Sequence, residues 1–279
     1  KDSTVLSGLK TLGAQVFIGH QASNLGAADV LVVSSAIDQS NPEVAAAKTK
    51  GLTILSRAQA LALLMSESKS VAVAGTHGKT TTTSMLTVAL QQAGLDPSFA
   101  IGGMINRGGT NAHLGSGEIF VAEADESDGS FLAYKPFGAI ITNIELDHVD
   151  HFPDIEAVNL VFLEFVSSIQ PGGFLVAGID SPGVVNLLAR ITRTDIEIVT
   201  YGESADYAIS HVSLQPTQTH ARITKLGKVL GELSLTIPGS HNIENATSVA
   251  VMSLKLGLTT QEIQKAFQKS AYKVRCDVS

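Results

Sequence analysis

Cysteine is almost absent from this chain: Cys276 is the one residue of that type among 279. No internal disulfide can form, and an intracellular location is expected. Long apolar runs are missing too. None approaches the roughly 20 residues that a membrane-spanning helix needs, and no signal peptide is evident. We therefore expect a cytoplasmic protein without membrane insertion. The first residue is Lys1 rather than Met, so the sequence need not begin at the natural N-terminus.

Basic residues are scarce relative to acidic ones. Lys and Arg together number 19 against 26 for Asp and Glu, which gives a formal net charge of -7. This balance argues against a nucleic-acid partner and against a motor that moves along nucleic acid. Only 16% of the residues are charged, whereas 44% are hydrophobic. A chain of this length and composition is globular, with a sizeable core and either one large domain or two.

The strongest motif lies in residues 71–83, which read Val-Ala-Val-Ala-Gly-Thr-His-Gly-Lys-Thr-Thr-Thr-Thr. Four small apolar residues predict a buried parallel strand, two glycines predict a tight loop, and the Lys-Thr pair begins a helix. This order of elements typically cradles a nucleoside triphosphate. Val73 stands where the general pattern has its first glycine, so the motif is a shorter variant. The alternative is a simple turn that carries a surface lysine.

Each part of this motif has an expected role. The glycines let backbone N–H groups approach phosphate oxygens, and the helix N-terminus adds partial positive charge. Lys79 is expected to reach the β- and γ-phosphates, and Thr80 or Thr81 to place a hydroxyl on Mg²⁺. The predicted nucleotide-binding residues of this stretch are Gly75, Thr76, His77, Gly78, Lys79, Thr80 and Thr81.

A second group of residues follows the apolar strand 118–122. Glu123, Asp125, Glu126 and Asp128 place four carboxylates within six residues. In a parallel sheet this strand end lies beside the phosphate loop, and so many like charges are costly unless a cation neutralises them. The stretch predicts a Mg²⁺ site facing the γ-phosphate. A solvated acidic loop is the alternative.

Two further stretches carry polar side chains at positions suited to binding. Strand 138–142 ends in Thr-Asn-Ile-Glu-Leu-Asp-His, where His148 is either a metal ligand or a surface histidine beside carboxylates. Pro238-Gly239 precedes a helix on which Asn242 and Asn245, three residues apart, share one face. Side-chain amides both donate and accept, which suits the edge of a purine base. Helix capping by one of the two asparagines is the alternative.

The pattern of elements predicts an α/β fold: a parallel P-loop-type sheet with helices on both faces and a small antiparallel edge, preceded by a partial Rossmann-like domain. In residues 1–67 we expect alternating helices and strands, with strands at 15–18, 29–33 and 52–55. In the second domain, residues 68–269, we expect a Gly-rich loop at 102–117 and antiparallel strands between 207 and 237, with a hairpin turn at 226–228. The last ten residues predict no clear structure.

Taken together, these stretches resemble the Mur ligase family, the ATP-dependent amide ligases of peptidoglycan synthesis. The resemblance covers nearly the whole chain and rests on residues 75–83, 123–128, 142–148 and 241–245. Within the family, it is closest to the branch that adds L-alanine to UDP-N-acetylmuramate. This chain has no lysine between Lys135 and Lys225, where several relatives carry a carbamylated lysine; that absence is expected of the alanine-adding branch.

The resemblance implies a two-step reaction with ATP and Mg²⁺ as cofactors and UDP-N-acetylmuramate and L-alanine as substrates. The lactyl carboxylate is first phosphorylated, and the amine of L-alanine then displaces phosphate. By position, Lys79, Glu123 and His148 are the implied catalytic residues. Thr80, Thr81 and Glu123 would hold one Mg²⁺ and His148 a second, while Asn242 and Asn245 would hold adenine.

The family pattern also implies three domains. Residues 1–67 are expected to be part of the uridine-nucleotide domain, 68–269 the ATP domain, and 270–279 a linker toward a C-terminal domain that this sequence lacks. The 279 residues are expected to bind nucleotide without completing ligation. Two alternatives stay open: a recycling ligase that attaches a whole peptide, which typically has Tyr in place of Ser127, and a nucleotide-binding regulator without catalysis. Neither the sequence nor the resemblance predicts an oligomeric state.

Overall fold

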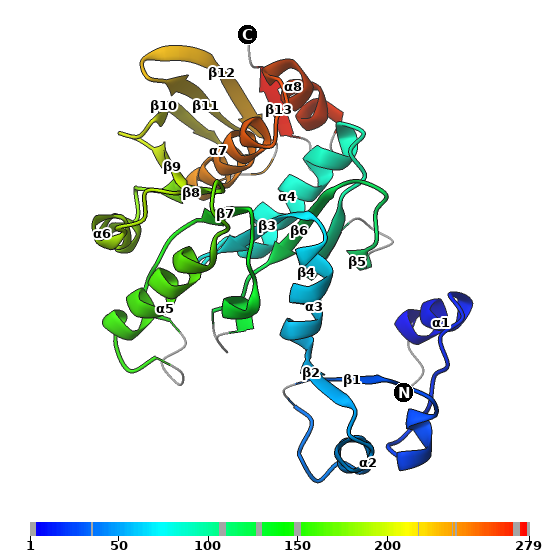
Figure 1. Ribbon diagram of the computed structural model, residues 1–279. Helices are drawn as coiled ribbons and strands as arrows, with labels where there is room; N and C mark the ends of the chain where they lie inside the picture. Colours follow the sequence, from blue (N-terminus) through cyan, green and yellow to red (C-terminus); the bar gives the residue numbers. More distant parts are fainter. Residues whose placement is uncertain are drawn as a thin grey trace. The chain divides into compact units, whose positions relative to one another are not determined.

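The computed structural model describes residues 4–34, 36–105, 110–126, 130–147, 152–216, 218–235, 237, 239–269 and 274–277. The chain forms two compact units, residues 1–61 and 62–279. Each unit has a sheet of its own, two-stranded in the first and eleven-stranded in the second over the described residues (Figure 1). The division falls within the helix α3 (Arg57–Ser66).

The first unit is a small parallel α/β arrangement. Its elements are α1 (Thr4–Thr11), the 3₁₀ helix η1 (Ala22–Leu25), β1 (Val30–Val33), α2 (Pro42–Lys50) and β2 (Thr53–Ser56). Strands β1 and β2 pair in parallel, with Val30 opposite Thr53. Helix α2 begins at Pro42, where the Asn41 side chain accepts a hydrogen bond from the Glu43 N–H at 2.9 Å and proline occupies the first turn.

The strand predicted at residues 15–18 is wrong: these residues are not part of a strand. Phe17 and Ile18 are 53% and 76% exposed. An apolar run becomes a strand only where a neighbouring strand completes its backbone hydrogen bonds. Among the described residues of this unit, β1 and β2 pair with each other and the run at 15–18 joins neither of them.

The second unit is built on one large mixed sheet. The strands are β3 (Lys69–Ala74), β4 (Ser98–Ile105), β5 (Thr110–His113), β6 (Ile119–Glu123), β7 (Gly138–Ile141), β8 (Phe174–Gly178), β9 (Glu197–Gly202), β10 (Tyr207–Gln215), β11 (Gln218–Lys225), β12 (Lys228–Leu235) and β13 (Val274–Asp277). The helices are α4 (Lys79–Gln92), η2 (Ser130–Ala133), α5 (Ile155–Ser168), α6 (Pro182–Arg190), α7 (Ser240–Lys255) and α8 (Thr260–Lys269).

The strand order is β13-β12-β11-β10-β9-β8-β7-β3-β6-β4-β5, and the run from β10 to β4 is parallel throughout. Helices α4, α7 and α8 pack together on one face of this sheet, and α5 and α6 lie on the other (Figure 1). The predicted α/β fold class is confirmed. The chain leaves β3 through α4 toward one edge and leaves β7 through α5 toward the other, so the winding direction reverses beside β3. In open parallel sheets, ligands bind at the carboxyl end of such a reversal.

The core is formed by the central strands and the helix after the phosphate loop. Val71 to Ala74 on β3 are fully buried, as are Leu86 and Leu90 on α4. Two threonine hydroxyls of α4 bond within the helix: Thr83 donates to the Lys79 carbonyl and Thr87 to the Thr83 carbonyl, each at 2.8 Å. Thr83 and Thr87 are therefore buried with partners of their own, whereas the buried Thr82 hydroxyl has none among the described residues.

The predicted antiparallel edge is confirmed, and its hairpin turn lies where the sequence predicts one. Lys225 pairs with Lys228 across a two-residue loop in which Leu226 and Gly227 have φ of 47° and 80°. This is the left-handed geometry that matches the twist of a hairpin. Residues 274–277 add a further strand, β13, opposite β12. The expectation that the last ten residues have no clear structure is therefore wrong for these four.

The expectation of a Gly-rich loop at 102–117 is also wrong in part. Strand β4 extends to Ile105 and pairs antiparallel with β5, Phe99 opposite His113. Two of the glycines here serve close packing: a Cβ on Gly115 would lie 2.1 Å from the Asp96 carbonyl oxygen, and one on Gly117 would lie 1.9 Å from the Leu95 oxygen. Glycine in this segment thus permits backbone contact, where the sequence suggested only a loop.

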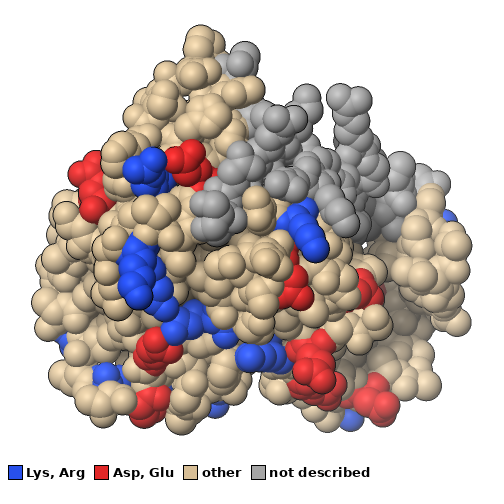
Figure 2. Space-filling view, turned by 90° about the horizontal axis from the view of Figure 1, so that it is seen from above, with Lys and Arg blue, Asp and Glu red and all other residues tan. Residues whose placement is uncertain are grey.

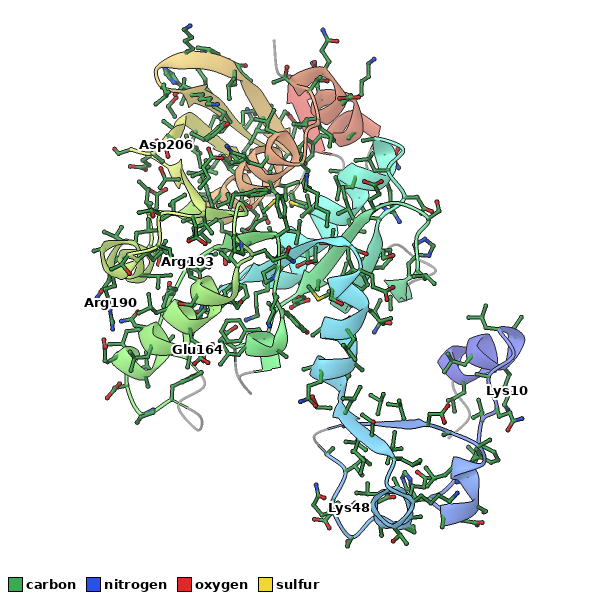
Figure 3. The ribbon with its side chains drawn as sticks, in the orientation of Figure 1. Lys10, Lys48, Glu164, Arg190, Arg193 and Asp206 are labelled. Carbon is green, nitrogen blue, oxygen red and sulfur yellow. The ribbon has the colours of Figure 1, made fainter. Side chains whose placement is uncertain are left out.

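Arg193 fastens the C-terminal end of α5 to the segment after α6 (Figure 3). Its Nη1 donates to the carbonyls of Val166, Ser167 and Ile169 at 2.6–3.1 Å. Its Nε and Nη2 donate to the two carboxylate oxygens of Asp195. The last carbonyls of a helix lack intrahelical donors, and a cation at this end also complements the helix dipole.

We expect Arg193→Ala to lower the free energy of unfolding by about 2 kcal/mol, because hydrogen bonds from a charged donor are lost at part-buried carbonyls. Urea unfolding followed by circular dichroism measures this change. Arg190→Ala is the matched control: Arg190 pairs with Glu156, whose side chain is 57% exposed, and such pairs contribute less than about 1 kcal/mol. Equal losses in the two variants would contradict the capping role.

Candidate active site

Three neighbouring strands bring the predicted site residues to one edge of the sheet. In the parallel registers, Val73 of β3 lies opposite Glu123 of β6, and Ala74 lies opposite Ile141 of β7. The segments that follow these strands, residues 75–78, 124–126 and 142–147, therefore emerge side by side. The sequence-based expectation that the acidic loop lies beside the phosphate loop agrees with this geometry.

Gly75 and Gly78 are required by geometry at both ends of the phosphate loop. Gly75 has φ 135°, and a Cβ there would lie 2.0 Å from Thr142 Oγ1. Gly78 caps α4 with φ 83°, and a Cβ there would lie 2.9 Å from Asn245 Oδ1. The first N–H groups of an α-helix have no intrahelical acceptor. A narrow loop of this kind at a helix N-terminus fits a phosphate group.

The loop is held from outside by the segment after β7. The Asn143 carbonyl accepts from the Thr76 N–H at 3.0 Å, while its side chain accepts from the His77 N–H at 2.8 Å and donates to the His77 carbonyl at 3.0 Å. Thr142 Oγ1 donates to the same carbonyl at 2.7 Å, and Thr76 Oγ1 accepts from the Glu145 N–H at 2.9 Å. Thr76 and His77 thus have protein partners, and their contact with nucleotide stays a prediction.

Lys79 lies across the loop that precedes it. Its Nζ donates to the Gly75 carbonyl at 2.7 Å and to both carboxylate oxygens of Glu126 at 2.9 and 3.0 Å. The side chains of Lys79 and Glu126 are 12% and 3% exposed. Glu126 was not among the predicted site residues, although the acidic motif contains it. Thr142 and Asn143 were also not among the predicted site residues, although they belong to the same stretch as the predicted residue His148.

Thr80 and Glu123 form the second contact between α4 and the acidic segment. Thr80 Oγ1 donates to Glu123 Oε1 at 2.7 Å, and the Gly102 N–H donates to Glu123 Oε2 at 2.7 Å. A hydroxyl and a carboxylate held together are the hard oxygen donors that Mg²⁺ prefers. These residues fit that ion. The structure does not describe His148, and within the described ranges no group of three or more His, Cys, Asp or Glu could hold a metal. The Mg²⁺ ligands, Thr81 and His148 included, stay predictions.

The predicted adenine-binding pair lies at the start of α7, close to the phosphate loop. Helix α7 begins at Ser240, so Asn242 and Asn245 both belong to its first two turns. Asn245 is 6% exposed, and its amide lies against Gly78. The structure therefore brings Asn245 together with the phosphate loop. Binding of a base by either asparagine stays a prediction.

Acidic side chains gather near the same end of α7. Glu244 is half-buried, and burial raises its pKa, with smaller contributions from the negative charges of Asp180 and Glu203. Asp180 accepts hydrogen bonds from the Glu203 N–H at 3.0 and 3.1 Å. Tyr201 behind them is fully buried, and burial, followed by the charge of Glu244, raises the pKa of its phenol.

Because the pKa of Glu244 is raised in the folded state, folding is opposed as this carboxyl ionises. The contribution of Glu244 to stability should fall as pH rises from about 4 toward 7, and this component should be missing in Glu244→Gln. We expect the variant to be the more stable at pH 7 by less than about 1 kcal/mol, since the groups are partly solvated, and equal to wild type at pH 4. Thermal unfolding at both pH values measures the difference. A difference that is the same at both would contradict the assigned cause.

The surface of the molecule carries both signs of charge. On the face shown in Figure 2, Lys and Arg side chains lie between Asp and Glu side chains. The expectation that nucleic acid is not a partner stays a prediction. No helix in the described part of the chain is long and apolar enough to cross a membrane.

Comparison with known proteins assigns the family. The model of the Mur ligase middle domain matches residues 73–253, and that of the Mur ligase family catalytic domain matches residues 1–69. The UDP-N-acetylmuramate–L-alanine ligase of Acidothermus cellulolyticus is 44% identical over 94% of this chain and 56% of its own length. This chain thus spans little more than half the length of the curated relatives it matches.

Solved structures agree with this assignment. The UDP-N-acetylmuramate–alanine ligase of Thermotoga maritima has a TM-score of 0.77 at 28% identity, covering 95% of this chain and 60% of its own. A murein peptide ligase from Psychrobacter arcticus has a TM-score of 0.80 at 25% identity, covering 95% and 60%. The matched family models cover the phosphate loop, the acidic segment and the start of α7, so the chain belongs to the Mur ligase family.

Proposed function

We propose that this chain is part of an ATP-dependent ligase that joins L-alanine to the lactyl carboxylate of UDP-N-acetylmuramate. The observation that carries the proposal is the geometry at the ends of β3 and β6, where Lys79 and Thr80 open α4 facing Glu126 and Glu123. The 44% identity to an L-alanine ligase over 94% of this chain supports the choice of amine.

The residues of the site suit phosphoryl transfer between two anions, which depends on positioning and on charge neutralisation more than on covalent catalysis. When bound, Mg-ATP would supply the phosphoryl group that activates the carboxylate. Lys79 would hold the β- and γ-phosphates against the loop, and Thr80 with Glu123 would hold the metal. Asn143 would keep the loop in shape, since its side chain and carbonyl bond residues 76 and 77.

We also propose a division of labour along the chain. Residues 1–67 would contribute to binding the uridine nucleotide, 68–269 would bind ATP, and 270–279 would lead toward a further domain. A cytoplasmic location is part of the same proposal, because the uridine-nucleotide precursor and ATP are both cytoplasmic substrates.

The test is ADP release by the full-length protein with UDP-N-acetylmuramate and Mg-ATP, comparing L-alanine with a peptidoglycan stem tripeptide as the amine. We expect turnover that requires both the muramate nucleotide and L-alanine. Turnover with the tripeptide alone would move the protein to the peptide-attaching branch, to which the Psychrobacter arcticus structure belongs by its name. Binding of Mg-ATP without turnover on either amine would favour a regulator.

A further inference from the structure

Lys79, the residue proposed to hold the nucleotide phosphates, already has an anionic partner. Both carboxylate oxygens of Glu126 lie within 3.0 Å of its Nζ. The pair is deeply buried, since only 12% of the Lys79 side chain and 3% of the Glu126 side chain are exposed. An ion pair so far removed from water is poorly screened and is not readily replaced by solvent.

The donor capacity of Lys79 is fully used by these contacts. A lysine ammonium has three protons. Its acceptors are the Gly75 carbonyl at 2.7 Å and the two Glu126 oxygens, with the Thr76 carbonyl further away at 3.3 Å. A phosphate oxygen can therefore bind Nζ only by displacing one of them. The two carbonyls belong to the loop backbone, which Asn143 holds in place, so the Glu126 carboxylate, which is carried by a side chain, is the acceptor that a phosphate would displace.

The neighbouring acidic residue has a different set of partners. Glu123 is held by Thr80 Oγ1 and by the Gly102 N–H, both at 2.7 Å. Neither partner carries a charge. The two glutamates at this strand end therefore differ in role: Glu123 sits among neutral donors that suit a metal ligand, and Glu126 neutralises the phosphate-binding cation.

We propose that Glu126 competes with the nucleotide phosphates for Lys79, so that nucleotide binding requires the Lys79–Glu126 ion pair to open. The inference rests on the proposed nucleotide site. Competition of this kind lowers the apparent affinity by the fraction of molecules in which Lys79 is free. It holds the affinity for ATP below the value that the phosphate loop could reach and keeps the lysine oriented toward the loop.

The experiment is the Kd for Mg-ATP, measured by isothermal titration calorimetry on the full-length protein without the muramate nucleotide. Glu126→Gln keeps the size of the side chain and removes its charge, and we expect it to tighten binding by about tenfold. Glu126→Asp keeps the charge but shortens the reach to Nζ, and we expect a gain of a few-fold. Glu118→Gln is the charge control: Glu118 is exposed at the opposite end of β6, and its Kd should equal that of wild type.

The outcomes separate the competing explanations. Weaker or unchanged binding in Glu126→Gln would overturn the proposal and leave Glu126 a structural partner of Lys79. A gain in Glu126→Gln without any gain in Glu126→Asp would overturn it in favour of general repulsion between carboxylate and phosphate. If Glu126→Gln fails to fold by circular dichroism, Glu126→Asp alone decides. Absence of Mg-ATP binding by wild type would instead refute the proposed function, and the inference with it.

Discussion

Lys79→Ala is expected to lower turnover in ADP release by roughly a hundredfold or more, since a single preorganised contact to a developing charge is typically worth ~3 kcal/mol. The same change should also weaken the fold. It removes the cation that faces Glu126, whose side chain is 3% exposed, and loss of one partner of a buried ion pair costs about 3 kcal/mol. Reduced turnover alone would therefore not distinguish a chemical role from partial unfolding.

The double variant Lys79→Ala with Glu126→Gln separates the two effects. It removes the unpaired buried charge, so the unfolding midpoint in urea should recover most of the loss, while turnover should remain at the level of the single variant. Recovery of turnover along with stability would show that Lys79 serves the fold rather than the reaction. Turnover near that of wild type in Lys79→Ala itself would remove the assignment of this lysine to the phosphates.

The second large effect is expected from Gly75→Ala. The new methyl group would lie 2.0 Å from Thr142 Oγ1 and 3.1 Å from both the backbone N and O of Asn143, at a φ of 135° that L-residues rarely adopt. The loop must then move away from the segment that positions it. We expect turnover to fall at least about a hundredfold, because displacements near 1 Å in a catalytic site have effects of that size.

Gly94→Ala is the matched control for that prediction. Gly94 also has positive φ, 83°, but a Cβ there meets nothing within 4 Å. This variant should lose about 1 kcal/mol of stability from backbone strain and keep its turnover. Similar losses of activity in both variants would show that strain in the region of α4, rather than the contact with Thr142, explains the effect of Gly75→Ala.

The central fold could be predicted because each of its parts has a local signal. Apolar strands followed by polar loops appear in order, and adjacency in a parallel sheet then places residues 75–78 beside 123–126. The terminal strand β13 could not be foreseen, since it exists only where β12 offers an edge. Strand β4 was missed for a different reason. Gly102 and Gly103 indicate a loop, although the apolar residues Phe99 and Ile101 alternate with their neighbours as in a strand.

The site was predictable in its types of residue but not in their pairing. Four carboxylates within six residues could each have faced Lys79. The register of β3 against β6 places Glu123 beside Val73, where it accepts from Thr80, while Glu126, three residues further along the chain, pairs with Lys79. Asn143 presents the same difficulty. Its three hydrogen bonds to residues 76 and 77 span 66 or more positions of the chain, a relation that no local pattern contains.

That long span has a consequence for how the protein folds. The hairpins of β10, β11 and β12 join residues close in sequence and can form early, whereas β3 must wait for β7, which lies far along the chain. The phosphate loop cannot hold its shape until β7 has docked and Asn143 has reached it. The capacity to bind nucleotide should therefore appear late in folding, together with the completed central sheet, and a nascent chain that ends before residue 143 should lack it.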